Sequence, residues 1–228
     1  NKLSAAALKD FAAAAQAIAK DKSVKRVIVT SGKPVFIVGA DITEFTSLFG
    51  AAKEDIKPFT GTNNANFNRL QNLPYPSCVA INGAAMGGGL EICLACDFRV
   101  MSTAASIGLP ETKLGILPGW GGTVRLPRII GVDEAVMWMA TGADKRADDA
   151  LKAGAVDAVA SPEQLRAVAL ATLEGAVNGK LNYQQRRSAK SSPLPLNDTE
   201  AMMAFFTIKS MVAQQAGKLG IVPLRHAL

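Results

Sequence analysis

The amino-acid sequence predicts an α/β fold with a helical C-terminal part. Short runs of β-branched and apolar residues alternate with helical patterns in the first half of the chain, where the order strand, strand, helix recurs. From Gly121 onward helical patterns dominate, and each ends at a glycine or a small polar turn. A chain of 228 residues with 49% hydrophobic residues is long and apolar enough to bury the core of one such domain.

The first part of the chain contains one predicted helix and two predicted strands. Ser4 is a suitable N-cap for a helix over Ala5–Lys20, where apolar residues recur at helical spacing. The run Val24–Thr30 predicts a strand, and Val35–Ala40 predicts a second one. A glycine lies at the end of this second strand, and Asp41 falls in the first turn of the helix that we expect to follow.

The middle of the chain alternates loops, strands and helices. Residues from about Ala51 to Leu73 predict a mobile loop that leads into a helix ending before Pro74. The next elements are predicted as a buried strand over Pro76–Asn82, a loop over Gly83–Gly89, a helix over Leu90–Cys96 and short strands over Phe98–Met101 and Ser106–Leu109. A glycine-rich loop is therefore expected between a buried strand and a helix.

The last part of the chain is predicted to be mostly helical. Three helices are expected over residues 122–131, 133–142 and 146–154, followed by a short strand over 156–160. Ser161 as N-cap and Pro162 at the first helical position predict a further helix over residues 161–179. The polar, proline-containing stretch Asn182–Asn197 predicts a linker-like loop before a last helix over Asp198–Gln215.

The charge balance favours anionic partners. The net charge is +6 and the pI is about 9.3, so phosphate-bearing molecules are the expected partner class. Basic residues are scattered along the chain, and only two Trp and two Tyr are present, so we do not expect nucleic-acid binding. No apolar run is long enough to cross a bilayer and no charged-then-apolar leader opens the sequence, so we expect a soluble protein without a membrane span.

The three cysteines predict a reducing compartment. An odd count in a chain of this length argues against a disulfide framework, and the cytoplasm is the expected location. Cys93 and Cys96 form a CxxC pattern inside an apolar run, and the single histidine is His226. We interpret this pair as core packing, with a redox or metal role as the alternative, and we expect no metal site.

The triple glycine Gly87–Gly89 is the first candidate for chemistry. Its position between a strand and a helix lets a ligand approach the backbone, and the N–H groups at a helix start favour negative charge. A phosphate-binding P-loop would need Lys and Ser or Thr next, but Leu90 and Glu91 follow, and the dinucleotide pattern is absent. An oxyanion role therefore fits better, and the amide of Ala40 is a second candidate donor, although an ordinary strand-to-helix connection would look the same.

Glu91 and Glu111 are the candidate acid and base. Both lie in apolar sequence, where a carboxylate is costly to ionise, and they lie in different predicted elements. Two carboxyl groups with different environments can divide the work of a general acid and a general base. The alternative for either residue is a capping or salt-bridge role.

These motifs resemble the enoyl-CoA hydratase/isomerase (crotonase) family. The resemblance is carried by AINGAAMGGGLEICLACDFRV, by IGLPETKLGILPGWGGTVRLPR and by FIVGADITEF, and it extends in order and spacing from Asn1 to about Gly179. It implies a crotonase-like spiral of ββα repeats, with a hydratase/isomerase core over residues 1–180. Residues 181–228 would then form a linker and a C-terminal helical segment, shorter than the closing helix of the family.

The resemblance also implies roles for individual residues. The N–H groups of Ala40 and Gly88 would bind the thioester carbonyl, and Glu91 and Glu111 would be the two catalytic glutamates. Together they would hold one water, which Glu91 activates for attack at C3 while Glu111 delivers a proton to C2 of the enolate. The further residues that would contact the substrate are Gly39, Asp41, Ile42, Gly87, Pro110 and Gly119, and the backbone from Ala40 to Ile42 would meet the adenine of coenzyme A.

At the level of function, the resemblance implies an enoyl-CoA hydratase of fatty acid β-oxidation that also isomerises enoyl-CoA. No cofactor would be needed, since coenzyme A is part of the substrate. The motifs are most similar to members that form one domain of a multifunctional protein with an NAD-dependent 3-hydroxyacyl-CoA dehydrogenase and a thiolase partner. The opening hairpin of the family and the dehydrogenase part are missing, so we expect a fragment.

Two other functions are compatible with the same resemblance. One is another crotonase-type acyl-CoA enzyme, namely a hydrolase, a decarboxylase or a dehalogenase. The other, from a different class, is a basic, non-catalytic RNA-binding scaffold of the same fold.

Overall fold

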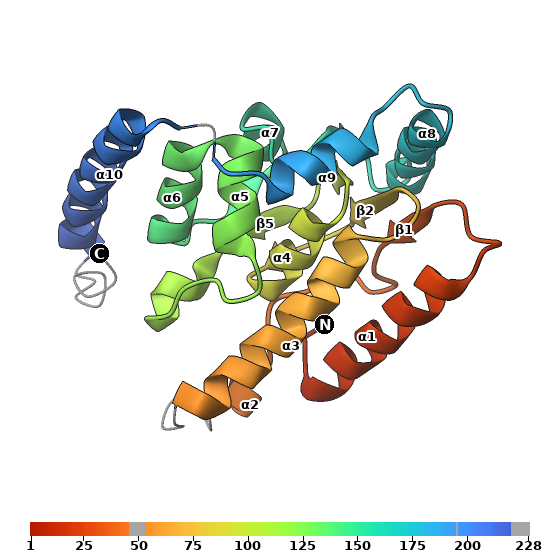
Figure 1. Ribbon diagram of the computed structural model, residues 1–228, viewed down its shortest axis with the longest axis horizontal. Helices are drawn as coiled ribbons and strands as arrows, with labels where there is room; N and C mark the ends of the chain where they lie inside the picture. The colour runs from red at the N-terminus through yellow and green to blue at the C-terminus, as the bar shows by residue number, and fades with distance from the viewer. Residues whose placement is uncertain (46–52, 195, 220–228) are drawn as a thin grey trace.

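The computed structural model of the chain describes residues 1–45, 53–194 and 196–219 (Figure 1). The helices are α1 (Ala5–Lys20), α2 (Ile42–Phe45), α3 (Lys53–Gln71), α4 (Gly88–Ala95), the 3₁₀ helix η2 (Pro110–Leu114), α5 (Gly122–Ile130), α6 (Val132–Thr141), α7 (Ala147–Lys152), α8 (Leu165–Val177), α9 (Tyr183–Ser191) and α10 (Asp198–Leu219). The strands are β1 (Val27–Val29), β2 (Ser77–Ile81), β3 (Ala85–Met86), β4 (Phe98–Ser102), β5 (Ser106–Gly108), β6 (Lys145–Arg146) and β7 (Ala158–Ala160). Within these ranges no helix is long and apolar enough to span a bilayer.

The main sheet is parallel and has the strand order β1-β2-β4-β7. Every residue of β2 and β4 is buried, which is why these strands are apolar along almost their whole length instead of alternating with polar residues. In β2, Cys78 and Ala80 face α8, while Val79 and Ile81 face the main core on the other side of the sheet. Helices therefore cover both faces of the sheet.

The smaller sheet has the order β3-β5-β6 and lies where the glycine-rich segment begins. Its β3 pairs in parallel with β5, with Ala85 opposite Ile107. Directly after β3, the N–H of Gly87 donates to the carbonyl of Gly108 at 2.9 Å. This pairing fixes the chain at the point where it enters α4.

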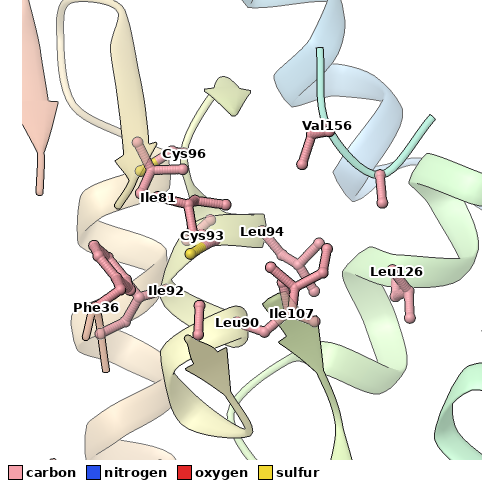
Figure 2. Packing of buried hydrophobic residues seen from close by; sticks show 14 of the residues in the cluster. Phe36, Ile81, Leu90, Ile92, Cys93, Leu94, Cys96, Ile107, Leu126 and Val156 are labelled. Carbon is pink, nitrogen blue, oxygen red and sulfur yellow. The ribbon is translucent and has the colours of Figure 1, made fainter. Parts of the chain in front are cut away.

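Helix α4 runs through the main hydrophobic core. All eight of its residues are buried, and Figure 2 shows Leu90, Ile92 and Leu94 pointing into the cluster of apolar side chains around it. Cys93 and Cys96 belong to the same cluster, as the core-packing interpretation of the CxxC pair predicts. Burial raises the pKa of the Cys93 thiol well above its ordinary value, which favours the uncharged form.

Most of the predicted elements are confirmed. Ser4 caps α1 by accepting a hydrogen bond from the N–H of Ala7 at 3.2 Å, and α10 begins at the predicted Asp198. Some boundaries move. Of the predicted strand over Val24–Thr30, only Val27–Val29 form β1, and α8 begins at Leu165 after a turn instead of at the predicted Pro162.

Two predictions in the first third are wrong. The segment Val35–Ala40 is not a strand, because it makes only isolated bridges, Ile37 with Ala85 and Ala40 with Leu3. The helix expected before Pro74 is present, but the loop expected to lead into it is also helical over its described part, so α3 spans Lys53–Gln71. The Gly, Thr, Asn and Lys residues of this segment favoured a loop, but the tertiary structure buries even Asn63, which is 4% exposed, against the core.

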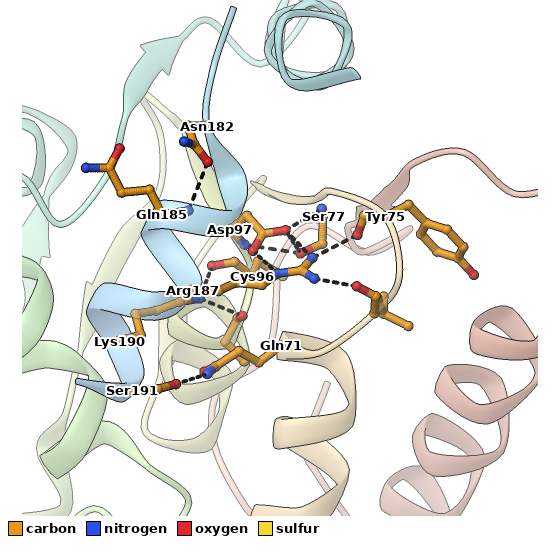
Figure 3. Close-up of polar contacts among 12 residues, drawn as sticks. Gln71, Tyr75, Ser77, Cys96, Asp97, Asn182, Gln185, Arg187, Lys190 and Ser191 are labelled. Carbon is orange, nitrogen blue, oxygen red and sulfur yellow. Dashed lines mark hydrogen bonds and ion pairs between the residues drawn. The ribbon is translucent and has the colours of Figure 1, made fainter. Parts of the chain in front are cut away.

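The prediction of a loop over Asn182–Asn197 is also wrong, because this stretch contains helix α9. Asn182 caps the helix by accepting from the N–H of Gln185 at 2.9 Å. Arg187 reaches from α9 into the core and donates to both oxygens of Asp97, each at 2.7 Å, and to the carbonyl of Tyr75 (Figure 3). Lys190, only 4% exposed, donates to the last carbonyls of α4 at 2.8–3.2 Å.

Two of the charges of α9, those of Arg187 and Lys190, therefore bind the core instead of facing solvent. The side chain of Asp97 is fully buried, and it also accepts hydrogen bonds from the N–H and the hydroxyl of Ser77. A buried carboxylate of this kind is tolerated only when it is paired and hydrogen-bonded. The division of the chain near residue 180 stays a prediction, and α9 packs against α5 of the core.

We predict that Arg187→Met lowers the free energy of unfolding by about 3–5 kcal/mol, because it leaves the buried Asp97 carboxylate without its cation. Urea denaturation of the purified protein measures this change. Lys180→Met, at an exposed site just before α9, is the matched control and should cost less than about 0.5 kcal/mol. A loss below about 1 kcal/mol for Arg187→Met would contradict this account of α9.

Candidate active site

A mostly apolar cavity of about 330 Å³ is lined by all four candidate catalytic residues, Ala40, Gly88, Glu91 and Glu111. Its walls come from the segment before α2, the start of α4, the 3₁₀ helix η2 and the loop before α5. The residues that line it are Val38, Gly39, Ala40, Thr60, Gly87, Gly88, Glu91, Pro110, Glu111, Leu114, Ile116, Leu117, Gly119 and Trp120. Glu91 and Glu111 are the only ionisable side chains among them.

Four of the six predicted substrate contacts line this cavity, namely Gly39, Gly87, Pro110 and Gly119. Asp41 does not: its carboxylate pairs with Lys2 at 2.8 Å and accepts from Thr43, and these contacts lower its pKa. Ile42 is the first residue of α2. The predicted role of these two residues in binding adenine stays a prediction.

The backbone around Ala40 lies against the start of α4. The N–H of Met86 donates to the carbonyl of Ile37 at 2.9 Å, so the two segments run side by side up to the cavity. The bridge between Leu3 and Ala40 uses the N–H groups of Leu3 and Asp41. No described acceptor takes the N–H of Ala40 or of Gly88, and both residues line the cavity. The two backbone N–H groups are therefore candidates for binding a ligand in the cavity.

Glycine is required at two positions of the triple glycine. Gly87 has a φ of +54° and caps α4, and a Cβ there would lie 3.0 Å from Oε1 of Glu111. A Cβ on Gly89 would lie 2.1 Å from the carbonyl oxygen of Ile37, a contact that backbone cannot accommodate without moving. The absence of side chains is what allows the segment before α2 and the start of α4 to approach each other.

Glu91 is 1% exposed and stands in the first turn of α4. Its Oε1 accepts hydrogen bonds from the N–H of Trp120 at 2.8 Å and from the N–H of Gly122 at 2.7 Å. No described group donates to Oε2. Burial raises the pKa of Glu91 to about 7, while these two N–H groups and the positive charge of Arg125 act in the opposite direction.

Glu111 follows Pro110 in η2. The neighbouring Thr112 anchors this helix, since its hydroxyl donates to the carbonyl of Met139 in α6 at 2.8 Å. Oε2 of Glu111 is buried and has no hydrogen-bond partner among the described residues. Burial, together with the charge of Glu91, raises the pKa of Glu111 to about 7. The geometry therefore favours a pair that holds a proton near neutral pH.

Several residues at the site were not anticipated from the sequence. Trp120 forms part of the cavity wall and packs against Phe59 and Phe67, with ring centroids 5.9 and 5.8 Å apart. Nη1 of Arg125 donates a hydrogen bond to the backbone carbonyl of Trp120. In the sequence, Trp120 lies between glycines and Arg125 lies in an apolar helix. Neither pattern predicts which groups these side chains contact. The described residues contain no group of three or more side chains that could hold a metal ion.

Comparison with known proteins connects this geometry to a family. A model described as enoyl-CoA hydratase/isomerase matches residues 1–205. The fatty acid oxidation complex subunit alpha of Pseudomonas aeruginosa strain LESB58 is 56% identical over 217 residues, which cover 95% of this chain and 30% of that protein. The subunit of the same name from Pseudomonas putida strain F1 is 54% identical with the same coverage. The chain thus spans less than a third of the length of these relatives.

A solved structure agrees with these matches. The crystal structure of an enoyl-CoA hydratase from Bacillus anthracis superposes with a TM-score of 0.72 and 32% sequence identity. The match covers 97% of this chain and 89% of the other.

We predict that Glu91→Gln lowers the pKa of Glu111, because it removes the negative charge that raises it. Gln keeps an oxygen that can accept the two N–H groups, so the loop before α5 should stay in place. An NMR titration of the side-chain carboxyl carbons of labelled glutamate measures the change. An unchanged Glu111 titration would show that the two carboxyl groups do not interact.

We also predict that the free energy of unfolding falls as the pH rises from about 4.5 to 7. A carboxyl with a raised pKa in the folded state binds protons more tightly there than in the unfolded chain, so its stabilisation is lost as pH rises through the folded pKa. Glu111→Gln removes one such group. The free energy of unfolding of this variant minus that of wild type should therefore be about 1–3 kcal/mol larger at pH 7 than at pH 4.5. Urea denaturation at both pH values tests this, and a pH-independent difference would contradict it.

Proposed function

This chain belongs to the enoyl-CoA hydratase/isomerase family, and we propose that it catalyses the syn addition of water to a 2-trans-enoyl-CoA to give a 3-hydroxyacyl-CoA. The observation that carries the proposal is the joint placement of two unused backbone donors and two carboxyl groups with raised pKa around one apolar cavity. An acyl chain matches the apolar walls, and a thioester oxygen matches the donors.

In this proposal the N–H groups of Ala40 and Gly88 bind the thioester oxygen. Negative charge develops on that oxygen as an enolate forms, and backbone donors placed in advance stabilise it without rearranging. The start of α4 contributes because the N-terminus of a helix favours negative charge. Loss of one such donor costs on the order of 3 kcal/mol, about a hundredfold in rate.

The two glutamates would bind one water molecule and share the two proton transfers of the reaction. Glu91 accepts a proton from the water as its oxygen attacks C3, and Glu111 donates a proton to C2, so the pair carries one proton before and after the reaction. A pair with raised pKa values suits this work, because acid and base catalysis are most efficient when the pKa lies near the working pH. The hydrogen bonds to Oε1 of Glu91 fix the orientation of that carboxyl.

The same pocket can also support isomerisation of a 3-enoyl-CoA to a 2-enoyl-CoA. Glu111 would move a proton between C2 and C4, and the thioester enolate is the intermediate that both reactions share. No cofactor takes part in either proposed step, because coenzyme A is carried by the substrate.

We further propose that this chain acts as one domain of a multifunctional protein of β-oxidation in the cytoplasm. Support comes from the relatives named fatty acid oxidation complex subunit alpha, of which it covers 30%. A 3-hydroxyacyl-CoA dehydrogenase domain with NAD would oxidise the hydration product, and a thiolase subunit would be the partner.

We predict that Glu111→Gln and Glu91→Gln each lower kcat/KM for hydration of crotonyl-CoA by about 10²–10⁴-fold, because each removes a positioned acid or base. Loss of absorbance of the conjugated enoyl thioester, followed in the full-length protein, measures this. Glu174→Gln is the matched control, since this exposed glutamate pairs with Arg26, away from the cavity.

The other candidate functions give different outcomes in the same assay. Release of free thiol from the acyl-CoA would favour a hydrolase. Near-full hydration by Glu111→Gln would contradict the proposed mechanism. Salt-sensitive retention of RNA without any turnover of crotonyl-CoA would favour the RNA-binding scaffold.

A further inference from the structure

Arg125 is a buried cation close to the cavity that the proposed chemistry does not use. It lies in α5 and is 4% exposed. It forms no ion pair with a carboxylate within the described part of the chain, since no acidic oxygen there lies within 4.0 Å of it. A buried charge without a directly bound counter-ion is costly. Its hydrogen bonds show what it does instead.

The guanidinium of Arg125 ties α3 to the loop before α5. Nε donates to Oε1 of Gln71 at 2.7 Å, and Nη2 donates to Oδ1 of Asn68 at 2.7 Å. Nη1 donates to the carbonyl of Trp120 at 3.1 Å. Gln71 is itself held, because its amide donates to the hydroxyl of Ser191 in α9 (Figure 3). The planar fork thus joins two side chains of a long helix to one backbone carbonyl.

Trp120 is hydrogen-bonded to both Arg125 and Glu91. Trp120 donates its N–H to Oε1 of Glu91 and offers its carbonyl to Arg125, so its backbone is held from both sides. A Cβ on Gly121 would lie 1.9 Å from Nη1 of Arg125, which shows how closely the guanidinium packs against this loop. Moving the guanidinium would therefore move the donors that fix the Glu91 carboxyl.

We propose that Arg125 is a positioning residue for the Glu91 carboxyl. By holding the carbonyl of Trp120 against α3, it fixes the loop whose N–H groups point at Oε1 and so sets the direction of Oε2 in the cavity. This proposal rests on the proposed role of Glu91 in the hydration reaction. Lysine cannot replace arginine here, because a single ammonium does not reproduce the planar fork that reaches Gln71, Asn68 and Trp120.

A second effect follows from the charge. Arg125 acts on Glu91 through space and lowers its pKa, and the charge of Glu91 in turn raises the pKa of Glu111. Removal of the charge should therefore raise the pKa of Glu91. Arg125→Lys keeps the charge, so a raised pKa of Glu91 in that variant reports the loss of positioned N–H donors and not the loss of charge.

The test uses Arg125→Lys and Arg125→Met in the full-length protein. For Arg125→Lys, kcat for hydration of crotonyl-CoA should fall at least tenfold while KM changes less than threefold, because the substrate contacts remain. For Arg125→Met, NMR titration of the labelled glutamate carboxyls should show Glu91 titrating at higher pH than in wild type.

Arg128 provides the matched control. It lies in the same helix and donates to the backbone carbonyls of Ser192 and Val124, both at 2.7 Å, with no bond to the loop before α5. Arg128→Lys should keep kcat within twofold of wild type. If Arg125→Met does not fold, the pair Asn68→Ala and Gln71→Leu removes the α3 acceptors and should lower kcat three- to tenfold at constant KM.

The proposal is overturned if folded Arg125 variants keep both kcat and the Glu91 titration of wild type. It is also overturned if kcat falls equally in the Arg128 control. The proposed function fails separately: if wild type does not hydrate crotonyl-CoA, that function is wrong, while the Glu91 titration in Arg125→Lys, which keeps the charge, still decides whether Arg125 positions the carboxyl.

Discussion

The burial of the Glu91 carboxyl is the constraint on which the rest of the site depends. An acid in the first turn of a wholly buried helix is stable only if neighbouring groups compensate it, and here two backbone N–H groups of the loop before α5 do so. Those donors require a particular backbone conformation of the loop. Its glycines permit this conformation, and Arg125 stabilises it by donating to the carbonyl of Trp120. Hydrogen bonding, loop geometry and the arginine are thus parts of one arrangement.

The fold brings together segments that lie far apart in the sequence. Strand β2 of the main sheet and β3 of the smaller sheet lead the chain into α4, and the close approach at Gly89 places the segment before α2 beside the helix start. Ala40 and Gly88 therefore line one cavity, and η2 brings Glu111 into the same cavity, next to Gly87. Apolar walls have a further consequence, because they raise the pKa of both carboxyl groups into the range where proton transfer near neutral pH is efficient.

Polar side chains also support the fold from within. Lys190 of α9 caps the C-terminal carbonyls of α4, at the opposite end from the cavity, while Arg187 pairs with the buried Asp97. A cation at a helix C-terminus complements the helix dipole, whose positive end lies at Gly88. Burial lowers the pKa of Lys190 to about 7, so holding this cation has a cost that three hydrogen bonds offset.

The sequence by itself determined the α/β class, the buried strands and the family, because hydrophobic periodicity and local motifs are properties of neighbouring residues. It also identified Glu91, Glu111, Ala40 and Gly88 as candidates, since acids and glycines in apolar sequence are unusual locally. The tertiary structure alone decided that α9 is a docked helix, that the segment before α2 is not a strand, and that Arg125 holds Trp120. These features depend on long-range contacts, in which a polar side chain finds its partner only after the chain has folded, and no local pattern encodes that partner.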